Sequence, residues 1–135
     1  MLQTDEDLKI MERWGCYFIC IPHIAEKITG VTVTAEIVMR TYAEALLSGL
    51  IKWTTFVKKP GKLLELFCHK LGWRVVVKTW WDEHDATDAY SYRIIKGRTI
   101  YGEHFACDDF NPDPRIEILE PLTDRYFVIE QKGRI

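Results

Sequence analysis

Residues 15–30 read GCYFICIPHIAEKITG, and this stretch decides the fold. Its apolar side chains run almost without interruption from Cys16 to Ile28, and Gly30 follows as a helix terminator. The pattern predicts a buried helix. Pro22 conflicts with it, because a proline inside a helix removes a backbone hydrogen bond and costs about 3 kcal/mol. The alternative is that the helix begins at Pro22 and Cys16 lies in the loop before it.

The rest of the front half also predicts helices. Residues 5–13 carry a few apolar side chains among charges and predict a short, weak helix. Thr34 is a suitable N-cap for a helix over 35–48, whose apolar residues repeat with helical spacing. Pro60 suits the first turn of a third helix, which has an apolar stripe and ends before Gly72.

The back half predicts β-strands. Segments rich in β-branched and aromatic residues alternate there with Gly, Pro, Asp and Asn. The expected strands are 74–80, 90–95, 103–107, 116–119 and 126–130. Helices followed by strands indicate an α+β fold in which N-terminal helices pack on a C-terminal antiparallel sheet. We expect a single domain over residues 1–135, long enough to bury a core.

Composition narrows the function classes. With 47% hydrophobic and 28% charged residues and a net charge of −2, the chain is neither disordered overall nor basic enough to favour nucleic-acid binding. The acidic start does not resemble a signal peptide, and no apolar run reaches the roughly 18 residues of a membrane span. We therefore expect a cytoplasmic protein with free thiols and no membrane partner. Composition leaves the oligomeric state open.

Cys16 and His104 are the residue pair with the most chemical potential. A thiolate is the reactive form of cysteine, and a nearby imidazole can take its proton. At the start of a helix, the macrodipole and the free N–H groups would favour a thiolate at Cys16, and Gly15 leaves room for a substrate. The alternative is that Cys16 and Cys20 are core residues and His104 is structural. Candidate orienting groups for the imidazole are Asp108, Asp109, Asn111, Asp113, Glu117 and Glu120.

Two other clusters have weaker chemical interpretations. The acidic loop 80–88 contains four acids and a histidine, but it lacks the pattern of a calcium loop. It is better explained as a solvated connection, or as a cleft rim with Trp80 and Trp81. The other cluster offers ligand types suitable for zinc at spacings that are unusual for a zinc site, namely Cys16, Cys20, His104 and Cys107.

The order of several short motifs is similar to that of a known superfamily. These motifs are Gly15-Cys16 at a helix start, GVTVTAEI over 30–37, Leu71-Gly72-Trp73, His104-Phe105-Ala106, and Glu120-Pro121 sixteen residues after the histidine. Together they span about residues 14–122 and resemble the papain-like cysteine peptidases. The closest resemblance is to the bacteriocin-processing double-glycine peptidases and their bacterial and phage relatives.

The resemblance implies a thiol hydrolase that cleaves an amide or peptide bond. Cys16 would be the nucleophile, His104 the general base and Glu120 the orienting acid, with Asp108 or Asp109 as alternatives to Glu120. The reaction needs no cofactor and no metal. We expect the peptide or amide substrate to contact Gly15, Trp14 and Trp81.

One departure from the family pattern keeps a second function open. The resembled family places an oxyanion-binding Gln about six residues before the cysteine, where this chain has Ile10. The alternative is therefore a catalytically inactive relative that binds a peptide, protein or small molecule in the same cleft.

Overall fold

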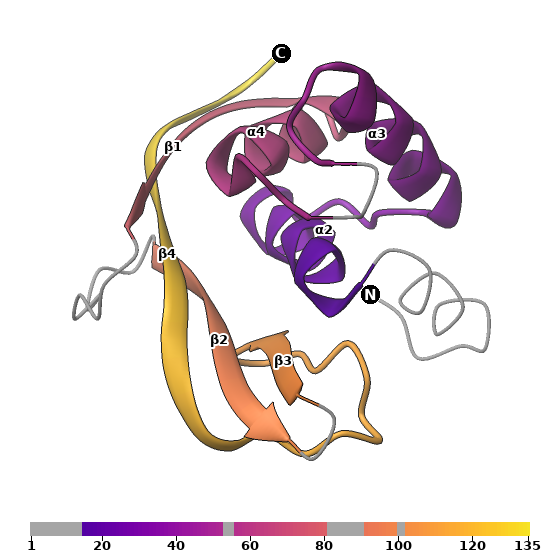
Figure 1. Cartoon of the computed structure of the whole chain (residues 1–135). Helices are drawn as coiled ribbons and strands as arrows, with labels where there is room; N and C mark the ends of the chain where they lie inside the picture. Colours follow the sequence, from indigo (N-terminus) through magenta and orange to yellow (C-terminus); the bar gives the residue numbers. More distant parts are fainter. Residues whose placement is uncertain (1–14, 53–55, 81–90, 100–101) are drawn as a thin grey trace.

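The computed structural model describes residues 15–52, 56–80, 91–99 and 102–135, which form helices followed by an antiparallel sheet (Figure 1). The helices are α2 (Cys16–Thr29), α3 (Ala35–Leu47) and α4 (Pro60–Lys70). The strands are β1 (Trp73–Trp80), β2 (Ser91–Thr99), β3 (Gly102–Cys107) and β4 (Leu119–Arg134). The predicted α+β class is confirmed, while the expected helix over 5–13 lies outside the described residues.

Helix α2 begins at Cys16 and continues through Pro22, so a helix start at Pro22 is wrong. The helix tolerates the proline because its residues from Phe18 to Ala25 are all buried, and packing rather than propensity stabilises most protein helices. It ends as predicted at Gly30, whose φ of 73° is left-handed and whose N–H donates to the Glu26 carbonyl at 2.7 Å.

The other two helices also follow their end signals. The Thr34 side chain accepts a hydrogen bond from the Ile37 N–H at 3.3 Å and caps α3. Pro60 occupies the first turn of α4, where its missing N–H removes no helical bond. The apolar stripe of α4 is buried at Leu63, Leu64 and Phe67, as its spacing predicts.

The four-stranded sheet has the order β1-β4-β2-β3, and all its neighbouring strands are antiparallel. β4 therefore pairs on both sides, and β3 is an edge strand. A bulge between Val76 and Val77 interrupts the β1–β4 register. The Val77 N–H donates to the Glu65 carboxylate of α4 at 3.1 Å, which ties α4 to the sheet at the bulge.

The expected strand over 116–119 is wrong, because β4 begins only at Leu119 and runs unbroken to Arg134. Ile116 instead belongs to a turn that uses both of its backbone groups. Its N–H donates to the Asp113 carbonyl at 3.0 Å, and its carbonyl accepts from the Asn111 side chain at 2.7 Å. Neither group is left for pairing with a strand.

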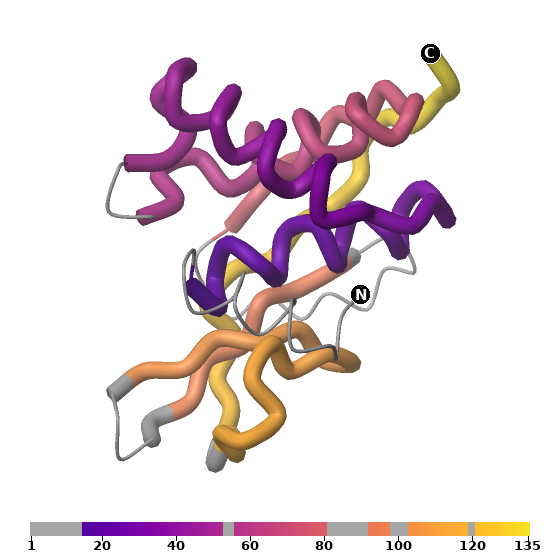
Figure 2. Tube along the Cα trace, turned by 90° about the vertical axis from the view of Figure 1, so that its right-hand side faces the viewer, coloured from indigo at the N-terminus to yellow at the C-terminus, as the bar shows by residue number. Residues whose placement is uncertain are grey.

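Helix α2 lies between the other helices and the sheet, with contacts to α4 on one side and to β3 on the other (Figures 1 and 2). Its buried residues join side chains of α4, β2 and β4 in one core, which includes Phe18, Ile21, Ile24, Leu63, Phe67, Ile94 and Phe127. Among the described residues, no helix is long and apolar enough to cross a membrane.

The contact between α4 and β1 gives a test of this packing. A Cβ added at Gly61 would lie 2.9 Å from Cγ2 of Thr79, closer than real Cβ contacts allow. We expect G61A to lower the free energy of unfolding by about 1 kcal/mol, since overpacking outweighs the better helix propensity of alanine. In a T79S background, which lacks that methyl group, the same change should stabilise the protein. Urea unfolding of the four proteins measures this, and equal effects of G61A in both backgrounds would contradict the packing.

Candidate active site

Gly15 and Cys16 form the start of α2. Gly15 has φ 85° and ψ 154°, a backbone conformation open in practice only to glycine. Among the described residues no side chain caps this helix end, and its first N–H groups have no acceptor within the helix. Cys16 is half-buried, whereas the other thiols are buried. The predicted position of Cys16 at a helix N-terminus is confirmed.

The environment of Cys16 favours its thiolate. Burial raises the pKa of the thiol, but the hydrogen bond with His104 lowers it, as do backbone hydrogen bonds with Phe105 and Tyr17. The net effect is a pKa below the ordinary value of a cysteine. The fold thus brings Cys16 and His104, which are 88 positions apart in the sequence, into hydrogen-bond contact.

His104 lies on β3 and is only 4% exposed. Its Nε2 lies 2.6 Å from Oδ1 of Asn111. The Asn111 amide has a defined orientation, because its Nδ2 donates to the Ile116 carbonyl at 2.7 Å while Oδ1 also accepts from the Asp113 N–H at 3.2 Å. Nε2 must therefore carry the proton that it shares with Oδ1, and Nδ1 is the nitrogen available to Cys16.

These contacts also favour a charged imidazole. Burial lowers the pKa of His104, but the hydrogen bonds with Cys16 and Asn111 and the charge of Asp113 raise it, and the net pKa lies above the ordinary value. Asp113 is buried and forms a two-bond ion pair with Arg115, with both N–O distances 2.8 Å. Both pKa shifts thus favour the charged forms of the two side chains, and the carboxamide of Asn111 orients the imidazole.

Asn111 was one of several candidate acceptors, and the acids near it contact other groups. Asp108 binds Arg93 at 2.7 Å, and Asp109 binds His23 at 3.1 Å and Lys27 at 2.7 Å. The side chain of Glu120, at the start of β4, lies outside the described residues. Its predicted role as the orienting acid stays a prediction, and the contact that the structure places on Nε2 is that of Asn111.

Of the expected substrate-binding residues, the structure describes only Gly15, which lies directly before Cys16. Trp14, Trp81 and the acidic residues 82–88 lie outside the described residues, as does Ile10. What the substrate contacts beyond Gly15 stays a prediction.

The zinc alternative finds no support in the geometry. Cys107 directs its Sγ to the Cys20 carbonyl at 3.6 Å, and the Cys16 and His104 side chains contact each other. Within the described parts of the chain, no group of three or more His, Cys, Asp or Glu residues is arranged to hold a metal ion.

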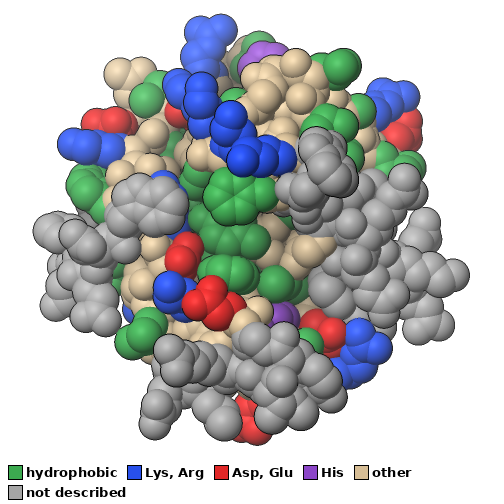
Figure 3. Space-filling model, viewed as in Figure 1, with side chains coloured by type: hydrophobic (Ala, Val, Ile, Leu, Met, Phe, Trp, Pro, Cys, Tyr) green, Lys and Arg blue, Asp and Glu red, His purple; other side chains and the backbone are tan. Residues whose placement is uncertain are grey.

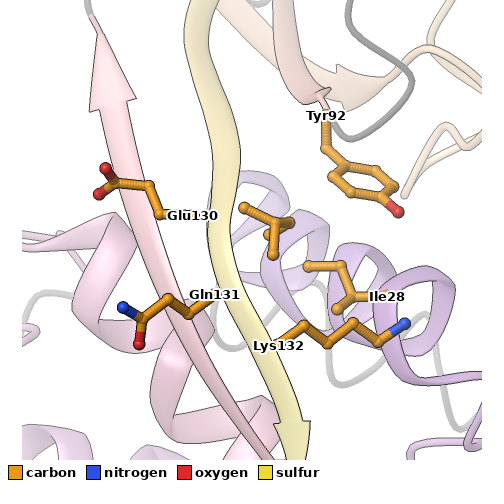
Figure 4. A pocket seen from close by; sticks show the side chains of 6 residues that line it. Ile28, Tyr92, Glu130, Gln131 and Lys132 are labelled. Carbon is orange, nitrogen blue, oxygen red and sulfur yellow. The ribbon is translucent and has the colours of Figure 1, made fainter.

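A pocket lies at the other end of α2, where Ile28 faces the sheet (Figure 4). Its volume is about 230 Å³, and its lining consists of Ile28, Tyr92, Ile129, Glu130, Gln131 and Lys132. On the face of the molecule seen in Figure 3, hydrophobic side chains gather in a central hollow with Lys and Arg along its upper border. The pocket lining contains no cysteine or histidine, so this pocket is separate from the site at Cys16.

Sequence reasoning missed one group near the site. His23 is seven residues after Cys16, a spacing that places both on one face of a helix, yet it was not among the candidates. Its Nε2 contacts Asp109, and its ring stacks on Phe110 with centroids 4.4 Å apart. The helical spacing from Cys16 was the available signal.

The four thiols should differ sharply in reactivity. Burial raises the pKa of Cys20 and raises that of Cys68 to about 12, whereas the pKa of Cys16 is lowered. We expect iodoacetamide at pH 6–7 to label Cys16 first, and H104A to slow that labelling while the exposed-histidine control H69A leaves it unchanged. Peptide mapping by mass spectrometry measures the order. Equal, slow labelling of all four thiols would count against the pair.

The Asp113–Arg115 ion pair should contribute to stability in a pH-dependent way. Arg115 holds the pKa of the Asp113 carboxyl below its usual value, so the contribution is present above the unfolded pKa of about 3.9 and is lost as the pH falls through the folded one. We expect D113N to lower the melting temperature at pH 6, and this difference to shrink towards about pH 2. Thermal unfolding at several pH values tests this, and a constant difference would contradict it.

Comparison with known proteins gives one match. A search of the curated proteins and a search of the solved structures found no similar protein. A family model described as "Protein of unknown function, DUF261" matches residues 1–111, a span that includes Cys16, His104 and Asn111. Because the match covers most of the chain, this protein belongs to the DUF261 family.

Proposed function

We propose that this protein is a thiol hydrolase that cleaves an amide or peptide bond. The observation that carries the proposal is a helix-terminal thiol, Cys16, in hydrogen-bond contact with an imidazole whose far nitrogen is held by Asn111 at 2.6 Å. Cys-His-Asn is a recurring form of the catalytic triad in papain-like proteases. The motif order of this chain resembles the same superfamily, which supports the proposal independently of the geometry.

The residues support a two-step reaction. The Cys16 thiolate attacks the substrate carbonyl, and the imidazolium of His104 gives its proton to the departing amine, so that a thioester forms as the C–N bond breaks. A water molecule then attacks the thioester and gives a proton to His104. The carboxylic acid leaves, and the Cys16 sulfur regains its negative charge beside the protonated imidazole. Asn111 keeps the ring orientation through both steps.

The negative charge on the attacked oxygen needs hydrogen-bond donors. The first N–H groups of α2 have no acceptor within the helix, and the N–H of Cys16 is one of them. Because position 10 holds Ile, a side-chain donor of the kind found in the resembled family is missing at that place. This makes the backbone donors of the helix start the principal oxyanion-binding groups in the proposed mechanism.

The same Ile10 favours a second candidate, a protein that binds a peptide in the cleft without cleaving it. Removing one oxyanion donor from an active enzyme typically lowers kcat by about 10²–10³-fold. A reactive Cys16 without turnover would match this candidate.

A peptide vinyl sulfone and a diverse synthetic peptide mixture separate the two functions. For a hydrolase, we expect covalent labelling of Cys16 and cleavage products detectable by mass spectrometry. C16A and H104A should abolish cleavage, N111A should lower it by about 10-fold or more, and H69A should leave it unchanged. Cleavage that persists in C16A would refute the proposal, and binding without cleavage by the wild-type protein would favour the second candidate.

A further inference from the structure

The segment after β3, residues 107–111, is tied to the same helix that begins at Cys16. On α2, Cys20 accepts a hydrogen bond from Sγ of Cys107 through its carbonyl at 3.6 Å. One and two turns further along, His23 and Lys27 contact Asp109. These positions follow Cys16 at helical spacing and share one face. The face of α2 that begins with Cys16 therefore binds residues 107–111, the segment that ends with Asn111.

The contact at Asp109 uses both of its carboxylate oxygens. Oδ1 lies 3.1 Å from Nε2 of His23, and Oδ2 lies 2.7 Å from Nζ of Lys27. These two bonds hold the carboxylate in a fixed orientation against α2, and we call His23, Lys27 and Asp109 the Asp109 clamp. The pairing crosses more than 80 residues of sequence, so it joins the helical part of the chain to the sheet.

The clamp extends directly to the residue that orients the imidazole. The His23 ring stacks on Phe110 at 4.4 Å and 17°, and Phe110 is hydrogen-bonded to Cys107 through its carbonyl at 2.8 Å. Nδ1 of His23 is buried without a hydrogen-bond partner among the described atoms. The described contacts that hold the imidazole are therefore the bond of its Nε2 with Asp109 and its stacking on the Phe110 ring. Asn111 is the next residue, and a shift of this turn would move its Oδ1 away from His104.

We propose that the Asp109 clamp is a positioning device, which holds Asn111, and through it His104, in register with Cys16 on the same helix. The inference rests on the proposed function for its catalytic meaning. His23, Lys27 and Asp109 are positioning residues, because none of them touches the reacting thiol or imidazole. The clamp gives α2 two roles, since it presents the nucleophile and also fixes the distance to its partner.

Asp108 offers a matched control for Asp109. It is the adjacent residue, it has the same charge and a similar exposed fraction (52% against 48%), and it also forms an ion pair at 2.7 Å. Its partner, however, is Arg93 on β2, so that pair joins the turn to the sheet and does not reach α2. D108A removes a charge from the same turn without releasing the turn from the helix.

The test is the pH titration of His104, followed by NMR of its ring C–H signals. We expect D109A to move the His104 pKa towards the ordinary value of about 6.5 and D108A to leave it unchanged. Iodoacetamide labelling of Cys16 at pH 6 should slow by about tenfold in D109A but not in D108A. D109E should restore part of both readouts, and K27M should act in the direction of D109A. Because Lys27 lies on the surface, K27M provides the test if D109A fails to fold.

Two outcomes overturn the clamp: no change of the His104 titration in D109A or K27M, or an equal change in D108A. The titration needs no substrate, so its result is separate from the hydrolase proposal. A wild-type protein that cleaves no peptide, together with a selective shift in D109A, would retain the clamp and reject the hydrolase. Peptide cleavage by the wild-type protein together with an unaltered D109A titration would do the reverse.

Discussion

Burial of α2 between the helices and the sheet is the constraint on which the remaining structure depends. The helix contributes Phe18, Ile21 and Ile24 to the core, and the shared core fixes its position relative to α4 and the strands. Its N-terminus then lies at β3, where Cys16 meets His104. If the same helix lay on the surface, its thiol could be just as exposed as it is here. Nothing, however, would hold that thiol opposite a histidine. The site is therefore a consequence of how one apolar helix is packed.

The use of a carboxamide beside His104 agrees with the burial of this region. A carboxylate that is removed from water must recover the lost solvation through strong partners, whereas a neutral amide needs only ordinary hydrogen bonds. Asn111 has those bonds on both of its polar atoms. The nearby buried carboxylate, Asp113, is neutralised by Arg115 and affects the imidazole through its charge. Orientation and electrostatic support are thus divided between two side chains of one turn.

The sequence predicted the elements with local end signals better than it predicted the contacts between them. Thr34, Pro60 and Gly30 act within a few residues, and each helix end that they predicted is confirmed. The alternative helix start at Pro22 was wrong, because a proline destabilises a helix locally, while the packing that offsets this loss depends on the whole fold. Local patterns therefore describe helices well where no long-range contact opposes them.

The candidate site divides in the same way. The Cys16–His104 contact was expected from the types of residue and from the resemblance, and it is present. The selection of Asn111 among six candidate acceptors depends on the Ile116 carbonyl, which is available because residues 116–118 precede β4 and are not part of a strand. The hydrogen bond between Asn111 and the Ile116 carbonyl depends on the tertiary structure, and no spacing of residues in the sequence indicates it.

The position of β3 at the edge of the sheet has a consequence for self-association. An edge strand presents unpaired backbone groups to any other chain that can form a strand beside it. Here the backbone of Phe105 on that edge is hydrogen-bonded to Cys16, and the start of α2 lies against the strand. The Cys16 sulfur thus forms a hydrogen bond with a backbone group of Phe105 that another polypeptide could otherwise use for strand pairing. The contact with Cys16 thus also makes this edge a poorer template for aggregation.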